Sequence, residues 1–71
     1  MEADIWGRRI RAFRKLKGYT QEGFAKELEV SVSAIGEVER GNRLPTRDLL
    51  EKIIEVLGVP EEELNPSKVK K

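Results

Sequence analysis

Apolar residues recur at spacings of three and four along most of the chain, which is the pattern of amphipathic helices. In the first segment Trp6, Ile10 and Phe13 share one face, while arginines and lysines occupy the others. Asp4 is the expected N-cap of this helix, and Gly18 closes it. The pattern therefore predicts a first helix that buries one apolar stripe.

Four further helices are expected, most of them introduced by a residue whose hydroxyl can cap a helix. Their predicted bounds are 21–28 after Thr20, Ser31 to Gly41, Thr46 to Gly58, and a short acidic helix over 60–64. No segment alternates like a strand, so the fold class predicted is an all-α five-helix bundle around one thin core layer. We expect a single domain over 1–66, followed by a frayed basic tail over 67–71.

The composition excludes most enzyme chemistry. The chain has no Cys and no His among its 71 residues, which removes disulfides, thiolate nucleophiles, histidine acid–base catalysis and nearly all zinc sites. A carboxylate-only metal site is the residual option, but the acidic run over 61–63 is better explained by a helix start, where acidic side chains are favourable. We expect a protein that is not an enzyme and that uses no cofactor or metal ion.

Charge is unevenly distributed although the total is balanced. The chain carries 14 Lys and Arg against 13 Asp and Glu. Residues 1–17 hold six positive and two negative side chains, whereas residues 48–66 hold one positive and six negative. This suits a protein that turns one face toward a polyanion, although a solvated surface laced with ion pairs gives the same pattern. No apolar run is long enough to span a membrane and the acidic start does not resemble a signal peptide, so a cytoplasmic protein is expected.

Three stretches of the chain together carry a specific resemblance. Residues 19–28 read YTQEGFAKEL, residues 30–31 read VS, and residues 35–45 read IGEVERGNRLP. With their flanks they closely resemble the helix-turn-helix of the Cro/phage repressor family, also called the Xre family, over about residues 6–64 of this sequence. The resemblance implies a lambda repressor-like domain that binds double-stranded DNA sequence-specifically and regulates transcription. It further implies repression by a homodimer on a palindromic operator, with recognition helices in major grooves about 34 Å apart.

The same resemblance assigns base contacts to the outer face of the third helix. The residues concerned are Val32, Ser33, Gly36, Glu37 and Arg40. Val32 suits a thymine methyl, and Gly36 would let the backbone come close to DNA. Arg40 could bind a guanine or hold a phosphate, and Glu37 could accept from a cytosine amino group or pair with Arg40. The alternative for the whole set is the polar outer face of any surface helix.

Phosphate contacts and one structural pair also follow from the resemblance. Gln21 is expected to bind a phosphate at the start of the second helix, and Arg43 and Arg47 to clamp phosphates near the start of the fourth. The alternative for Gln21 is an ordinary polar residue at a helix start, and the alternative for Arg43 and Arg47 is a pair of solvated charges. Arg14 and Glu39 are expected to form a buried ion pair between the first and third helices.

Two features of the chain leave questions for the structure. Glu29 stands at a turn position where the family commonly has glycine, and a left-handed backbone there would be strained by about 1 kcal/mol. Val59 and Leu64 suggest a dimer surface around the fourth and fifth helices.

A protein-interaction module with the same fold, such as an antitoxin or a coactivator-bridging domain, is the alternative function. It is favoured by Glu37 and the weakly basic third helix.

Overall fold

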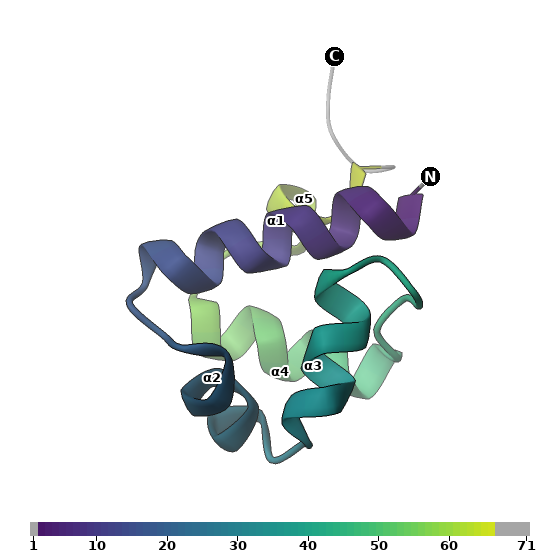
Figure 1. The fold of residues 1–71 in the computed structure, drawn as a ribbon. Coiled ribbons are helices and arrows are strands. Elements are labelled where there is room, and N and C mark those ends of the chain that lie inside the picture. Colours follow the sequence, from purple (N-terminus) through teal and green to yellow (C-terminus); the bar gives the residue numbers. More distant parts are fainter. Residues whose placement is uncertain (1, 67–71) are drawn as a thin grey trace.

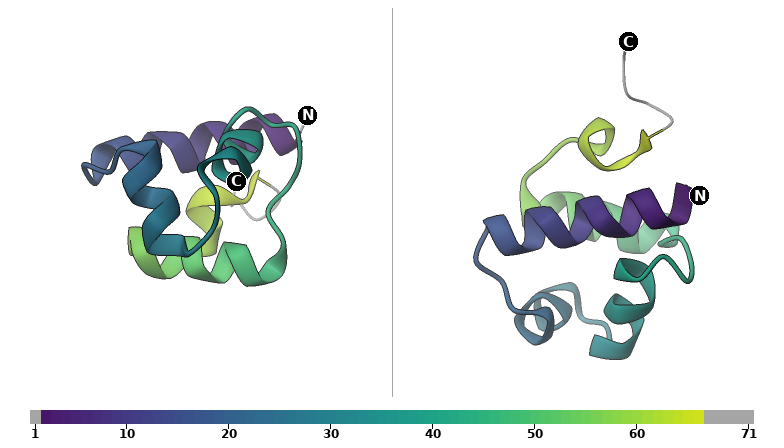
Figure 2. Two further views of the ribbon diagram at one scale, coloured as in Figure 1. Left: turned by 60° about the horizontal axis from the view of Figure 1, so that its bottom comes forward. Right: turned by 45° about the horizontal axis from the view of Figure 1, so that its top comes forward.

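The computed structural model describes residues 2–66, and this part of the chain is entirely helical apart from its connections (Figure 1). The helices are α1 (Glu2–Leu16), α2 (Gln21–Leu28), α3 (Val32–Glu39), α4 (Arg47–Leu57) and α5 (Glu61–Leu64). α1 packs against α3 and α5, while α2 packs against α3 and α4 (Figure 2). The predicted all-α five-helix architecture is confirmed, and the expected tail over 67–71 lies outside the described residues.

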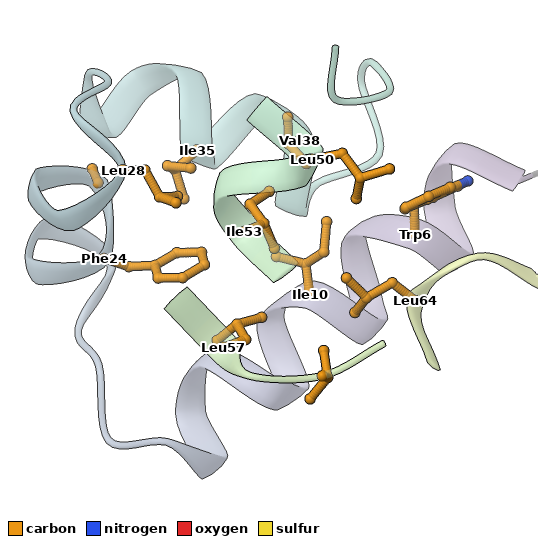
Figure 3. Packing of buried hydrophobic residues seen from close by; sticks show 12 residues of the cluster. Trp6, Ile10, Phe24, Leu28, Ile35, Val38, Leu50, Ile53, Leu57 and Leu64 are labelled. Carbon is orange, nitrogen blue, oxygen red and sulfur yellow. The ribbon is translucent and has the colours of Figure 1, made fainter. Parts of the chain in front are cut away.

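A single apolar core holds the helices together. The side chains that point into it come from all five helices and from the link before α5 (Figure 3): Trp6, Ile10, Phe24, Ala25, Leu28, Ile35, Val38, Leu50, Ile53, Leu57, Val59 and Leu64. They lie on one stripe of each helix, as the spacing of apolar residues predicts. Trp6 is only 7% exposed, so it is a core residue and its ring is not available to stack on a base. Among the described helices none has the length and apolar content to cross a membrane.

Hydroxyl side chains begin three of the helices. The Thr20, Ser31 and Thr46 oxygens accept from the backbone N–H three residues on, at 3.0, 3.1 and 3.2 Å. Each bond satisfies one of the N–H groups that a helix start leaves without an intrahelical acceptor. These three predicted N-caps are confirmed, and they fix where α2, α3 and α4 begin.

The predicted N-cap at Asp4 is wrong. α1 already begins at Glu2, which places Asp4 inside its first turn. An acidic side chain is favourable anywhere in that turn, because it faces the positive end of the helix dipole. An aspartate at position 4 therefore indicates the start of the helix only to within one turn.

Four helices end with a left-handed residue, and three of these ends share a further backbone bond. α4 ends at Gly58 with φ 69°, and the left-handed residues of the other three ends are Gly18 with φ 85°, Glu29 with φ 62° and Gly41 with φ 79°. At each of these three ends the next residue's N–H reaches back five residues, at 3.0, 3.0 and 2.9 Å respectively. Two of the three positions have the residue that this conformation favours, and Glu29 has a side chain that strains it.

Replacing Glu29 by glycine is therefore expected to stabilise the fold by about 1 kcal/mol, which raises the Tm of a domain of this size by about 4–8 °C. The substitution also removes an exposed ion pair with Lys52, 3.7 Å between Oε1 and Nζ, which contributes little. Glu29→Ala is the matched control, since it loses the same ion pair and keeps a β-carbon. Thermal unfolding that ranks the glycine variant no higher than the alanine variant would contradict the strain.

Candidate nucleic-acid interface

The turn between α2 and α3 fixes one face of α3 against the protein and leaves the other to solvent. Ile35 is fully buried and Val38 is 2% exposed. α3 packs on both α1 and α2, so these two helices support its inner face. At its N-terminal end Val32 is 40% exposed and Ser33 is also exposed. This is the orientation that a helix needs to enter a major groove.

Glu37 and Arg40 form an ion pair on this outer face. Arg40 Nη2 donates to Glu37 Oε2 at 3.3 Å, and the two side chains are 43% and 62% exposed. The structure thus contains the pairing that was one of the two interpretations of Glu37. Because an exposed pair at this spacing contributes only about 0.2–0.5 kcal/mol, a DNA group can replace either partner.

Gly36 does not lie open on this face. It is buried, and a β-carbon built on it would be 3.0 Å from Arg40 Nη1. Gly36 and Arg40 are one helical turn apart, so the long side chain folds back over the glycine. The predicted close approach of DNA to the Gly36 backbone would therefore require Arg40 to move.

Gly36→Ala is expected to raise the stability of the free protein by up to about 1 kcal/mol, because alanine is favoured over glycine inside a helix. The nearest atoms to the new methyl belong to Arg40, whose exposed end is free to shift. The same shift displaces Arg40 and should lower operator affinity. Urea unfolding and titration with an operator duplex measure the two effects. Equal operator binding by both proteins would reject a role for this position.

A surface hollow lies at the start of α2, beside the outer face of α3. It is lined by Arg11, Arg14, Thr20, Gln21, Glu39 and Arg40. Thr20 and Gln21, at the start of α2, are among its lining residues, and a helix start favours anions. Arg11 is exposed, and no DNA contact was predicted for it from the sequence. Its spacing of three from Arg14 on α1, which puts both on one helix side, was the available signal.

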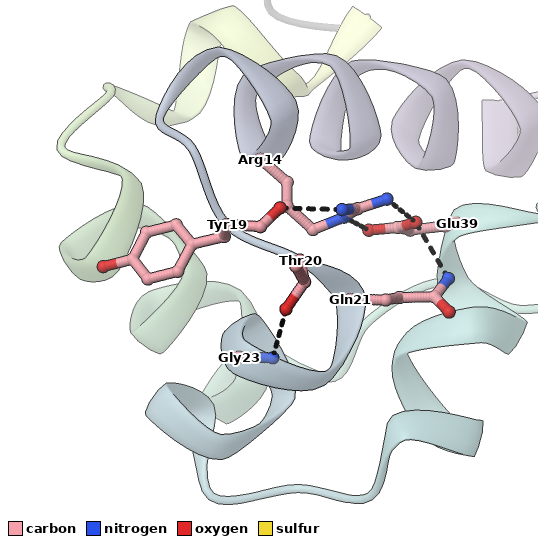
Figure 4. Close-up of polar contacts among 6 residues, drawn as sticks. All are labelled: Arg14, Tyr19, Thr20, Gln21, Gly23 and Glu39. Atoms are coloured by element: carbon pink, nitrogen blue, oxygen red, sulfur yellow. Dashed lines mark hydrogen bonds and ion pairs between the residues drawn. The ribbon is translucent and has the colours of Figure 1, made fainter.

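A buried ion pair between α1 and α3 lines this hollow, and its hydrogen bonds are drawn in Figure 4. Arg14 Nε and Nη2 donate to Glu39 Oε2 and Oε1 at 2.7 and 3.2 Å, and Arg14 Nη1 donates to the Tyr19 carbonyl at 2.9 Å. Gln21 Nε2 donates to Glu39 Oε1 at 3.1 Å. The expected pair of Arg14 and Glu39 is present, and the structure adds Gln21 to it.

Arg43 and Arg47 lie apart from the hollow. Arg43 is exposed in the α3–α4 loop and lines a second depression with Thr46, the N-cap of α4. Arg47 donates to Glu61 Oε1 at 3.2 Å, with 59% of its side chain exposed. The structure thus gives Arg47 an acidic partner that a phosphate would have to replace.

Comparison with known proteins decides the family. The helix-turn-helix family model matches residues 10–64. The chain belongs to the helix-turn-helix family. This confirms the resemblance to Cro and phage repressors, and the α2–turn–α3 unit is the motif for which the family is named.

Individual helix-turn-helix relatives agree with this assignment. The chain is 65% identical over 66 residues to YazB of Bacillus subtilis (strain 168), described as an uncharacterized HTH-type transcriptional regulator, covering 93% of this chain and 96% of that protein. The restriction-modification controller protein C.AhdI of Aeromonas hydrophila superposes with a TM-score of 0.81 at 32% identity, over 87% of this chain and 94% of that one. The clp gene regulator ClgR of Corynebacterium glutamicum gives a TM-score of 0.84 at 28% identity, over 90% and 68%.

These relatives fix the class of the protein. Each is described as a regulator or a controller protein. The chain is therefore a DNA-binding transcriptional regulator of the helix-turn-helix family and not an enzyme, in agreement with its lack of Cys and His.

Proposed function

We propose that the protein is a transcriptional repressor that binds double-stranded DNA sequence-specifically, as a homodimer on a palindromic operator in the cytoplasm. The observation that carries the proposal is the position of Arg40. It lies on the outer face of α3 beside Glu37 and also lines the hollow at the start of α2. A surface suited to base edges and a surface suited to phosphate therefore adjoin, as DNA recognition requires.

Val32 and Ser33, at the exposed N-terminal end of α3, take the first base contacts in this proposal. A small apolar and a small polar side chain allow the helix to approach the groove closely, and Val32 fits a thymine methyl. Glu37 accepts from a cytosine amino group once Arg40 has turned away from it. Arg40 and Gly36 complete the face, Arg40 through a guanine edge or the adjoining phosphate.

Phosphates are held on both sides of this face. Gln21 and Arg11 bind one phosphate at the hollow, together with the N–H groups at the start of α2. Arg43 and Arg47 bind others near the start of α4, where Arg47 exchanges the Glu61 carboxylate for a phosphate. These contacts orient the domain, and the α3 side chains read the sequence.

The dimer surface expected from Val59 and Leu64 needs correction. Val59 is 8% exposed and Leu64 is fully buried, so both belong to the core of one subunit and offer nothing apolar to a second. We propose that the two-fold symmetry of the operator brings the subunits together, in half-sites about 34 Å apart. Occupation of the operator is the simplest way for a domain of this size to repress.

Selection of random duplexes by the purified protein tests the proposal. We expect a palindromic consensus, a complex of two subunits per duplex, and binding about 1,000-fold or more tighter than to random DNA. With three phosphate-binding arginines per subunit, and so six per dimer, affinity should fall about 1,000-fold between 50 and 200 mM salt. Flat, weak and sequence-independent binding would overturn the proposal in favour of a protein-interaction module of the antitoxin or coactivator type.

Single substitutions then separate readers from phosphate contacts. Val32→Ala, Ser33→Ala and Glu37→Gln should each alter the base preference at one operator position. Arg43→Ala should weaken binding to all sequences alike and reduce the salt dependence. If the α3 variants lose affinity uniformly and keep the same consensus, the base-reading assignment is wrong.

A further inference from the structure

The side-chain amide of Gln21 is already engaged inside the protein. Its Nε2 donates to Glu39 Oε1 at 3.1 Å, and Glu39 in turn is held by two bonds from Arg14 (Figure 4). Gln21 is the only glutamine in the chain. An amide has two N–H donors and one carbonyl acceptor, so one donor faces Glu39 and the second is left for another acceptor.

The Glu39 carboxylate determines which end of the Gln21 amide faces it. Its side chain is 2% exposed, and the described part of the chain has no buried side-chain polar atom without a hydrogen-bond partner. A carboxylate accepts hydrogen bonds and repels a carbonyl oxygen, so the nitrogen end of the Gln21 amide must face it. The hollow lined by Arg11 and Arg40 lies beside this amide.

We infer that Glu39 is a positioning residue for DNA binding: it holds the Gln21 amide in the free protein so that the second N–H is aimed at a phosphate oxygen. The inference rests on the proposed DNA-binding function. A side chain that is already ordered loses less freedom when the phosphate arrives. The buried ion pair of Arg14 and Glu39 thereby contributes to the phosphate contact of Gln21 as well as to the stability of the fold.

NMR of the free protein tests the positioning without DNA. The side-chain amides of Gln21, Asn42 and Asn65 are the only three in the chain, and Asn42, which is exposed, is the internal control. We expect an order parameter for the Gln21 amide near the rigid-backbone value of about 0.85, and a value for Asn42 below about 0.6. A Gln21 amide as mobile as that of Asn42 would overturn the inference.

A double-mutant cycle tests the consequence for binding. Gln21→Ala should lower operator affinity about tenfold in the wild-type background, the value of one hydrogen bond to a charged group. In the R14M/E39L background, where nothing orders the amide, the same substitution should cost about threefold or less. An equal loss in both backgrounds would overturn the inference, because a purely structural role of the pair would leave the Gln21 contribution unchanged.

Arg43→Ala is the matched control for the cycle. Arg43 lies in the α3–α4 loop outside the hollow, so its replacement should cost the same in both backgrounds. The failure of the proposed function would look different, since the wild-type protein would then bind no operator. In that case the order parameter of the Gln21 amide still decides whether Glu39 holds it.

Discussion

Replacement of Arg14 by methionine is expected to lower the free energy of unfolding by about 3–5 kcal/mol. Arg14 is 7% exposed and provides two of the three side-chain hydrogen bonds that the structure gives to Glu39. Without it the Glu39 carboxylate stays buried with only the neutral Gln21 amide as its partner. A domain of about this size has only about 3–5 kcal/mol from its core, so a large fraction of the molecules should be unfolded at 25 °C.

The double variant R14M/E39L is the control that separates charge from packing. Both charges are replaced by apolar side chains of similar length, and such replacements of buried pairs are often neutral or stabilising. We therefore expect it to regain most of the stability that R14M loses. Urea unfolding followed by far-UV circular dichroism measures both variants. A double variant as unstable as R14M would show that side-chain packing, and not the stranded carboxylate, causes the loss.

Features encoded by neighbouring residues could be predicted from the sequence. The caps at Thr20, Ser31 and Thr46 bond to the backbone three residues away, so their chemistry is complete within one turn. The apolar stripes follow from helical periodicity for the same reason. The predicted fold was correct because most of its helix starts are local signals of this kind.

Features that depend on a neighbour from elsewhere in the chain could not be predicted so well. Apolar Val59 and Leu64 were assigned to a dimer surface, because periodicity marks a residue as apolar without saying what covers it. No DNA contact was predicted for Arg11, because its proximity to the start of α2 depends on how α1 packs. Gln21 was expected to contact DNA, and its bond to Glu39 joins two residues that lie 18 positions apart in the sequence.

Gly7 is the clearest example of a residue whose role depends on a neighbour from elsewhere in the chain. The substitution Gly7→Ala is expected to destabilise the protein by about 2–3 kcal/mol. Alanine normally stabilises a helix interior relative to glycine by about 1 kcal/mol. At Gly7 a β-carbon would overlap the Val38 carbonyl oxygen and lie 2.6 Å from the Glu39 carbonyl oxygen. These are backbone atoms at the end of α3, so α1 and α3 would have to separate.

Gly36→Ala provides the comparison. The new methyl group there meets only the flexible end of a side chain, so this substitution should stabilise the protein. Opposite signs at the two positions, measured by urea unfolding, would establish that the close approach of α1 to α3 requires glycine. A Gly7→Ala variant as stable as wild type would mean that the helices part without cost. Because Glu39 lies at that contact, moving α3 also disturbs the buried pair and the outer face of α3. Operator affinity should therefore fall in the Gly7 variant even under conditions where it is fully folded.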